Sequence, residues 1–178
     1  IYNTTLAFDR SGEIIAQYRK IHLFDITTPD GKSYKESDTV ISGDQVITYN
    51  ADNLVIGCSI CYDLRFSELY LELAKKNADL IMIPAAFTLQ TGKDHWSTLI
   101  KARAIETQAY VLAPAQCGEY PDGKGGFRQT WGHSMIVDPW GHVIAQTSDG
   151  IGWASATINS DYLQTIRNNV PVANHRVL

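Results

Sequence analysis

Two apolar runs in the middle of the chain limit the folds that it can adopt. Residues 79–85 (DLIMIPA) and 110–115 (YVLAPA) are nearly continuous apolar stretches, as expected for strands buried on both faces. Between them, residues 94–108 place Trp96, Leu99 and Ile100 on one face of a predicted helix. A helix between two buried strands predicts an α/β chain.

Further elements are expected on both sides of this centre. Gly12 allows the tight turn of a first hairpin, and Ser67 is expected to cap a helix. We expect strands at 2–9, 13–19, 45–49, 54–60, 134–137, 143–146 and 152–158, and helices from 67 and at 160–168. Residues 21–44 and 117–132 are expected to be long loops, which are often functional. No repeat or linker divides the chain, so we interpret residues 1–178 as one domain with an α/β layered (α+β) sandwich.

Composition excludes several classes of protein. With 19% charged and 44% hydrophobic residues, the chain has the balance of a folded protein and not of a disordered one. A net charge of −4 gives no indication of a nucleic-acid partner, and no apolar run approaches the roughly 20 residues that cross a bilayer. Three cysteines, an odd count, predict the reduced thiols of a cytoplasmic protein. Because the chain opens at Ile1 inside an expected strand, we expect the native start to lie upstream.

The stretch GCSICYDLRF (57–66) places two of the three cysteines three positions apart. A redox pair of the thioredoxin type begins at a helix N-terminus, whereas Cys58 lies inside an expected strand. A zinc site needs two further thiolates or imidazoles at suitable spacing, and the chain offers no such cluster. A strand cysteine such as Cys58 is expected to be a small buried hydrophobe. Cys61 follows the strand and precedes a helix, so it is either a second packed thiol or a reactive one.

A reactive thiol needs a base and a group that stabilises charge. None of the five histidines has an evident strand-end position beside Cys61. Lys20 ends the first hairpin and is a candidate for the charged partner, although a solvated surface lysine is the commoner case.

Several separated motifs, in order along nearly the whole chain, resemble the nitrilase superfamily of carbon–nitrogen hydrolases. They are YRKIHLFD (18–25), Glu36-Ser37, GCSICYDLRF (57–66), PAAFTLQTGKDHW (84–96), KARAIETQ (101–108), AQCG (115–118) and GHSMIVDPWG (132–141). Agreement of several motifs in order is far more specific than one short pattern. Within the superfamily, the chain is most similar to the amidases that act on deaminated glutathione or on ω-amides of 2-oxo acids.

The resemblance implies roles for particular residues. Cys61 matches the nucleophile, Lys20 the lysine that stabilises the oxyanion, and Glu36 a carboxylate that positions this lysine. The backbone N–H of Tyr62 matches the second oxyanion donor. Four further residues match a segment that lines the pocket in the family: Phe87, Thr88, His95 and Trp96. Arg65 and Glu68 are expected to brace the nucleophile turn.

The resemblance also implies a fold and a reaction. The fold is a nitrilase-like αββα four-layer sandwich that lacks its N-terminal elements in this chain. The reaction is hydrolysis of a small-molecule amide through a thioester, releasing ammonia and a carboxylic acid, with no cofactor and no metal. A homodimer is implied as well. Pocket specificity is expected to depend on residues 25–44 and 117–132.

One part of the family's pattern is missing. The general base is a glutamate on a strand well before the lysine, and Glu13, the only glutamate before Lys20, does not match that motif. We therefore expect an incomplete chain of an active enzyme. A truncated and inactive ligand-binding relative is the alternative, and a thiol redox protein using Cys58 and Cys61 is a third.

Overall fold

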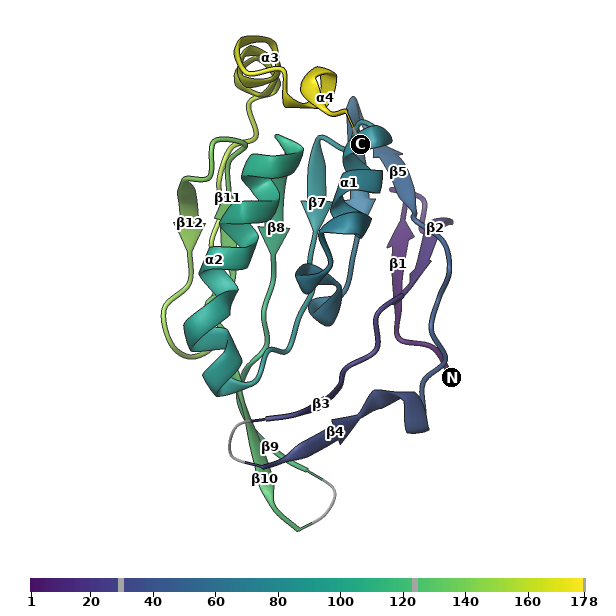
Figure 1. Ribbon diagram of the computed structural model, residues 1–178, viewed down its shortest axis with the longest axis vertical. Coiled ribbons are helices and arrows are strands. Elements are labelled where there is room, and N and C mark those ends of the chain that lie inside the picture. Colours follow the sequence, from purple (N-terminus) through teal and green to yellow (C-terminus); the bar gives the residue numbers. More distant parts are fainter. Residues whose placement is uncertain (29–30, 123–124, 178) are drawn as a thin grey trace.

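A six-stranded sheet forms the centre of the computed structural model, which describes residues 1–28, 31–122 and 125–177 (Figure 1). The strand order is β12-β11-β8-β7-β6-β5. The three central strands, β6, β7 and β8, run parallel, β5 and β11 flank them antiparallel, and β12 pairs antiparallel with β11. The bounds are β5 Thr48–Ala51, β6 Leu54–Cys58, β7 Leu80–Met82, β8 Tyr110–Ala113, β11 Met135–Val137 and β12 Val143–Gln146. The predicted buried strands are confirmed as β7 and β8, although both are shorter than their apolar runs.

Two helices cover one face of this sheet. Figure 1 shows α1 (Ser67–Lys75) and α2 (Leu89–Thr107) lying across the central strands. Their apolar side chains close the main core, where Leu73, Ile81 and Trp96 are fully buried. Two further helices, α3 (Ser160–Asn169) and α4 (Val172–His175), lie beyond the opposite end of the sheet from the carboxyl ends of the parallel strands.

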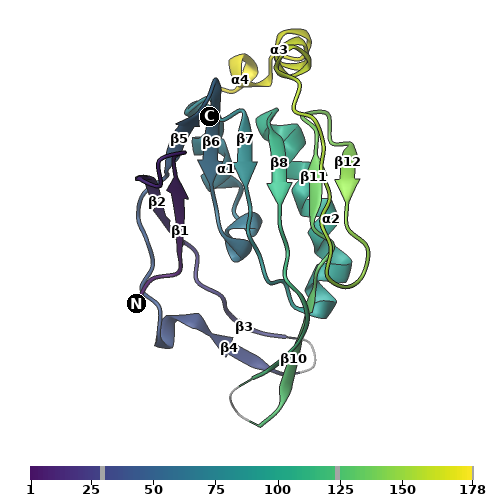
Figure 2. The ribbon, with the colours of Figure 1, turned by 180° about the vertical axis from the view of Figure 1, so that it is seen from behind.

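The first hairpin lies on the other face. Its strands, β1 (Thr4–Phe8) and β2 (Ile14–Arg19), pair antiparallel as predicted and stand beside β5 and β6 (Figure 2). An ion pair at 2.8 Å between Arg10 and Asp52 joins the turn of this hairpin to the turn between β5 and β6. The hairpin ends at Lys20, so its position decides where that lysine lies.

The two segments expected to be loops contain short antiparallel sheets. Residues 21–44 hold β3 (Asp25–Thr27), β4 (Ser33–Lys35) and the 3-10 helix η1 (Glu36–Asp38). Residues 117–132 form the hairpin of β9 (Cys117–Pro121) and β10 (Phe127–Trp131). Both sheets lie past the carboxyl ends of β6, β7 and β8, the edge at which α/β proteins commonly bind ligands.

Three other expectations need correction. The residue at the N-cap of α1 is Phe66, and Ser67 is the first helical residue. Helix α2 begins at Leu89, five residues before the predicted start near Asp94. Residues 152–158 are extended but form no strand. The predicted helix at 160–168 is confirmed as α3, with Asn159 accepting a hydrogen bond from the N–H of Tyr162 as its cap.

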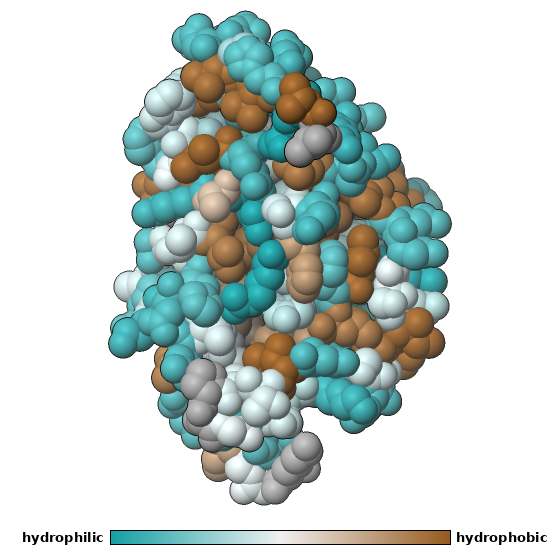
Figure 3. All heavy atoms as spheres, viewed as in Figure 1, coloured by the Kyte–Doolittle hydropathy of each residue, from teal (hydrophilic) through white to brown (hydrophobic). Residues whose placement is uncertain are grey.

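The surface over α1 and α2 is mostly hydrophilic, with hydrophobic residues scattered among the polar ones (Figure 3). More apolar surface belongs to the first hairpin, where Leu6, Phe8 and Ile14 are 43, 56 and 59% exposed. Among the helices that the structure describes, none combines the length and the apolar character needed to cross a membrane. Within the same residues, no group of three or more His, Cys, Asp and Glu side chains is arranged to hold a metal ion.

Candidate active site

Cys61 lies in a strained turn at the carboxyl end of the central sheet. Strand β6 ends at Cys58, and Cys61 begins the 3-10 helix η2 (Cys61–Arg65) with a φ of 49°. This left-handed conformation is uncommon for a residue other than glycine, and such strain concentrates at functional sites. The N–H of Cys61 donates to the carbonyl of Pro84 at 2.9 Å, which fixes the turn against the segment that follows β7.

Lys20 and Glu36 form a partly buried ion pair beside this turn. The Lys20 side chain is only 2% exposed, and its Nζ lies 2.5 Å from Oε2 of Glu36. The interpretation of Lys20 as a solvated surface lysine is therefore wrong. Glu36 also accepts the N–H of Phe24 at 2.7 Å and Nδ2 of Asn3 at 3.1 Å. Three donors hold this carboxylate in place, and it in turn orients the ammonium group of Lys20.

The same contacts keep Glu36 ionised. Burial raises the pKa of its carboxyl, but the hydrogen bonds from Lys20, Phe24 and Asn3 outweigh burial and leave the pKa below its ordinary value. Glu36 is therefore a positioning group, already occupied by three donors, and not an evident proton acceptor.

The environment of the Cys61 thiol is mixed. Burial raises its pKa most strongly, while a hydrogen bond from the N–H of Ala86 and the charge of Lys20 act in the opposite direction. Burial wins, and the pKa of the thiol lies above its ordinary value. Lys20 thus favours the thiolate as expected from the sequence, but it does not lower the pKa of the resting thiol overall. A proton acceptor is needed before Cys61 can attack.

The backbone of Tyr62 offers a donor next to the thiol. Within the described part of the chain, the N–H of Tyr62 has no hydrogen-bond acceptor, whereas the N–H groups of Cys61 and Asp63 are both bonded. Edge-on contacts with Phe24 and Phe66, at ring-centroid distances of 5.1 and 5.3 Å, hold the Tyr62 ring. A rigidly held N–H that has no acceptor within the described structure can donate a hydrogen bond to a developing oxyanion.

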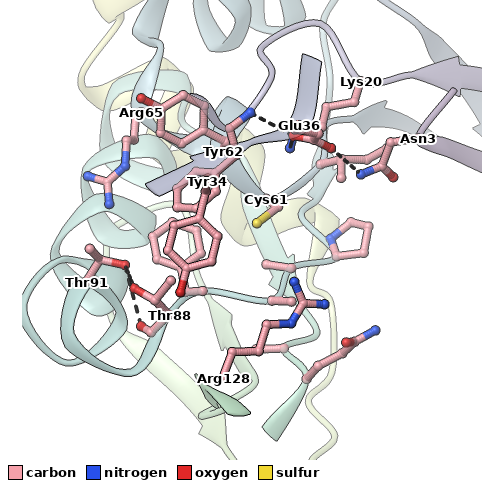
Figure 4. A pocket seen from close by; sticks show the side chains of 18 of the residues that line it. Asn3, Lys20, Tyr34, Glu36, Cys61, Tyr62, Arg65, Thr88, Thr91 and Arg128 are labelled. Carbon is pink, nitrogen blue, oxygen red and sulfur yellow. Dashed lines mark hydrogen bonds and ion pairs between the residues drawn. The ribbon is translucent and has the colours of Figure 1, made fainter. Parts of the chain in front are cut away.

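These groups open into one large pocket of about 1340 Å³. Figure 4 shows the Cys61 sulfur pointing into it, with Lys20 and Glu36 on one side and Arg65 on the other. Both segments that were expected to control specificity contribute side chains, among them Tyr34 from β4 and Arg128 from β10. The wall is thus built from the central sheet edge and from the two small sheets below it.

Two arginines bring unpaired positive charge to the pocket. Arg65 contacts Nδ1 of His95 at 3.3 Å, and its guanidinium lies 5.3 Å from the centroid of the Phe87 ring. In the described residues, neither Arg65 nor Arg128 forms an ion pair with a carboxylate, although both line the pocket. Burial lowers the pKa of Arg65, yet an arginine stays protonated at any working pH. Both guanidinium groups are therefore available to an anionic ligand.

Four pocket residues were named from the sequence, and the structure separates them into two pairs. Phe87 and Thr88 line the pocket. Trp96 and His95 are not among its described lining residues. Trp96 is fully buried, packs against Phe87 at a centroid distance of 4.9 Å, and donates its Nε1–H to the carbonyl of His133. His95 is exposed on α2 and reaches the site only through Arg65.

The residues 1–168 match the family model described as carbon–nitrogen hydrolase. The chain belongs to the carbon–nitrogen hydrolase family. A deaminated glutathione amidase from Synechocystis is 47% identical over 178 residues, which cover 99% of this chain and 64% of the relative. The crystal structure of the NitFhit protein of Caenorhabditis elegans matches with a TM-score of 0.90 and 44% identity, over 99% of this chain and 42% of that one.

A second solved structure supports the same fold. Nit3 of Saccharomyces cerevisiae, described as a member of branch 10 of the nitrilase superfamily, matches with a TM-score of 0.84 and 31% identity, over 99% of this chain and 60% of that one. The nitrilase-like α/β fold expected from the motifs is thereby confirmed. The chain spans between 53 and 64% of the length of the curated deaminated glutathione amidases named in these comparisons, from Bos taurus and from Synechocystis.

One buried residue of this carbon–nitrogen hydrolase site was missed by sequence reasoning. Asp63, two residues after Cys61, is fully buried and accepts hydrogen bonds from both the nucleophile turn and the lysine segment. The only signal in the sequence was the aspartate of the stretch GCSICYDLRF (57–66), and this signal did not indicate burial. The other missed residues, Tyr34 and Arg128, lie in segments whose strands were not predicted.

Proposed function

We propose that the protein carrying this chain hydrolyses a non-peptide amide bond through a thioester on Cys61. The observation that carries this proposal is the position of Cys61. It is a left-handed residue just past a strand end, beside the pair of the buried Lys20 and the partly buried Glu36, and its sulfur lies in a large pocket. Membership of the carbon–nitrogen hydrolase family supports it. Cys61 and Lys20 are the proposed catalytic residues, Glu36 positions the ammonium of Lys20, and the proposed mechanism uses no metal or cofactor.

The chemistry follows ordinary acyl transfer. A base takes the Cys61 proton, and the sulfur attacks the amide carbonyl. The ammonium of Lys20 and the N–H of Tyr62 then stabilise the oxyanion, a contribution of about 3–4 kcal/mol for one such donor. The C–N bond breaks as the base returns the proton to the leaving nitrogen, which leaves an acyl thioester. Water, deprotonated by the same base, attacks the thioester, so that a carboxylic acid is released and the thiol is restored.

The base that deprotonates Cys61 is not assigned to either of the carboxylates beside the thiol, Glu36 and Asp63. Glu36 already accepts three donors, and Asp63 accepts hydrogen bonds from Tyr18, His22 and Ile60. We propose that a carboxylate outside this 178-residue chain supplies it. Amide turnover by the 178-residue chain alone would contradict this assignment and would make Glu36 the first residue to test.

The pocket favours a substrate that carries carboxylates. Arg65 and Arg128 lie on different sides of Cys61 in Figure 4, and two guanidinium groups suit two carboxylates bound in the bidentate manner. Several relatives are named deaminated glutathione amidases. We therefore propose deaminated glutathione, or a similar ω-amide of a 2-oxo acid, as the substrate. Deaminated glutathione contains only secondary amides, so its cleavage releases an amine, and ammonia is released only from a primary ω-amide.

Replacing the two arginines tests this substrate class. Arg65→Met and Arg128→Met should each raise KM for deaminated glutathione about 10- to 100-fold, because each removes a charge-assisted contact to a carboxylate. The matched control is Arg10→Met, since Arg10 is exposed on the first hairpin and outside the pocket. Initial rates should be measured with deaminated glutathione, with a primary ω-amide of a 2-oxo acid, and with butyramide as an uncharged amide. An equal rise in KM for butyramide would contradict carboxylate recognition, and ligand binding without any turnover would favour an inactive binding protein.

A further inference from the structure

A buried carboxylate links the two segments that carry Cys61 and Lys20. Asp63 is fully buried and accepts Tyr18 Oη at 2.6 Å and the N–H of Ile60 at 2.9 Å on one oxygen. Its other oxygen accepts the N–H of His22 at 2.9 Å and lies 2.8 Å from Nδ1 of the same residue. Two donors therefore come from the side chains of Tyr18 and His22, and two from backbone N–H groups.

The sequence positions of these donors show which two segments the Asp63 carboxylate joins. Tyr18 and His22 lie two residues before and two residues after Lys20, while Ile60 immediately precedes Cys61. We propose that Asp63 is a positioning residue, which holds the lysine segment and the nucleophile turn in one register so that the Lys20 ammonium faces the Cys61 sulfur. This inference rests on the roles proposed above for Cys61 and Lys20.

Capping of the turn does not by itself explain this arrangement. Asp63 does cap η2 through the N–H of Ile60, but a cap needs only that hydrogen bond. The remaining donors all belong to the segment 18–22, which is more than forty residues away in the chain. A buried carboxylate is costly unless its oxygens are fully satisfied, and here the lysine segment satisfies them. Burial, and then the facing Asp63 carboxylate, raise the pKa of Tyr18, so its hydroxyl stays a donor.

An aromatic contact adds a second tie between the same segments. The His22 ring stacks on Phe66, the residue after η2, with a centroid distance of 3.8 Å and an interplanar angle of 5°. Glu36, by contrast, holds the far end of the lysine, since it contacts Nζ. The two carboxylates thus have separate tasks, because Glu36 aims the ammonium and Asp63 sets the backbone from which it extends.

The experiment measures how strongly Lys20 influences Cys61, and whether that influence depends on Asp63's donors. Cys61 alkylation by iodoacetamide is followed from pH 6 to 11 by mass spectrometry, with peptide fragmentation to separate Cys61 from Cys58. The midpoint of the pH profile is compared with and without Lys20→Met in four backgrounds. These are the unsubstituted chain, Tyr18→Phe, His22→Phe and Tyr70→Phe.

The backgrounds are matched. Tyr18→Phe removes one donor of Asp63, and His22→Phe removes another while keeping an aromatic ring against Phe66. Tyr70→Phe is the control, because Tyr70 is equally buried and its hydroxyl contacts only Ser59, at 2.9 Å, among the described side chains. Circular dichroism and thermal unfolding confirm that each variant is folded, and His22→Phe decides the question if Tyr18→Phe does not fold.

The expected result is a change in coupling. Lys20→Met should raise the midpoint by about one pH unit in the unsubstituted chain and in Tyr70→Phe. The rise should be less than half as large in Tyr18→Phe or His22→Phe. Equal rises in all backgrounds, an equal reduction in Tyr70→Phe, or no rise in the unsubstituted chain would each overturn the proposal. Because alkylation needs no turnover, failure of the proposed amidase activity would be seen separately, in the rate assays.

Discussion

Cys58 and Cys61 are three residues apart, yet the fold gives them opposite surroundings. Cys58 ends β6, is 2% exposed, and lies among the apolar side chains of the main core. Cys61 begins a left-handed turn, and its sulfur points into the pocket. Burial raises the pKa of both thiols, but only Cys61 has the N–H of Ala86 and the charge of Lys20 acting against burial. The path of the backbone, and not the spacing of the residues, separates the two thiols.

The burial of Cys58 also counts against a redox interpretation of the pair. The structure describes Cys58, Cys61 and Cys117 as free cysteines. A thiol that takes part in disulfide exchange must be accessible as a thiolate, whereas burial raises the pKa of Cys58 to about 11. Cys58 is therefore a core residue, as the sequence predicted, and no redox role is proposed for it.

The largest expected difference between the two thiols concerns activity. In the protein that carries this chain together with the proposed base, Cys61→Ala should lower amide hydrolysis by about four orders of magnitude or more, because it removes the proposed nucleophile. Cys58→Ala should keep the rate within about tenfold of the original, since Cys58 lies outside the pocket lining. Rates of amide hydrolysis, together with acid quenching and intact-mass detection of the thioester, check this prediction. An equal loss in both variants would show that the distinction between the thiols is mistaken.

The ammonium group is the second difference, because Lys20 acts only on Cys61. In the same base-containing protein, Lys20→Ala should lower kcat about 10²- to 10³-fold while KM changes only a few-fold, since the lysine is proposed to stabilise the oxyanion and not the bound substrate. Lys75→Ala is the control, because Lys75 is an exposed lysine on α1 paired with Glu72. Steady-state kinetics on both variants give the answer, and an unchanged kcat in Lys20→Ala would remove Lys20 from the mechanism.

The smallest expected effect concerns stability. Cys58→Ala should lower the free energy of unfolding by about 1 kcal/mol at pH 7, because it leaves a small cavity in the core. The raised pKa of Cys58 contributes stability that is present below pH 9 and lost as the pH rises toward 11, so the gap between the original chain and the variant should narrow over this range. Urea unfolding at pH 7 and pH 10 measures both values. A gap that widens at pH 10 would contradict the burial assigned to Cys58.

The centre of the fold was predictable because its signal is local. The residues of β7, β8 and α2 are themselves mostly apolar at the positions that become buried, so the sequence of each element predicts its burial. The hairpin of β9 and β10 has no such signal, since most of its residues are exposed and glycines interrupt it. This hairpin is held by a residue that is distant in the sequence. Gly92 of α2 packs so closely on Trp131 that an added Cβ would lie 2.2 Å from the Trp131 Cβ.

The candidate site divides in the same way. Motif agreement identified Cys61, Lys20 and Glu36, and the structure brings these three together, although their catalytic roles stay predictions. The burial of Asp63 was not predictable, because it depends on donors from the first hairpin and the segment after it, the Tyr18 hydroxyl and the His22 N–H. The placement of His95 was also missed. Helix α2 begins directly after Thr88, a residue type that favours the N-cap position, and this start signal was overlooked.

The two small sheets have a consequence for how such a site can diversify. Tyr34 and Arg128 lie on β4 and β10, which belong to separate two-stranded sheets, whereas Cys61 follows a central strand. A single bridge, between Thr130 and Thr88, joins β10 to the segment that precedes α2. Insertions or substitutions in these small sheets leave the hydrogen-bond ladder of the six-stranded sheet intact. Under the proposed function, substitutions at Tyr34 and Arg128 can therefore change the ligand without altering the strand that leads to Cys61. Arg65 and Glu36 have less freedom to change, because Arg65 shares the turn of Cys61 and Glu36 holds Lys20.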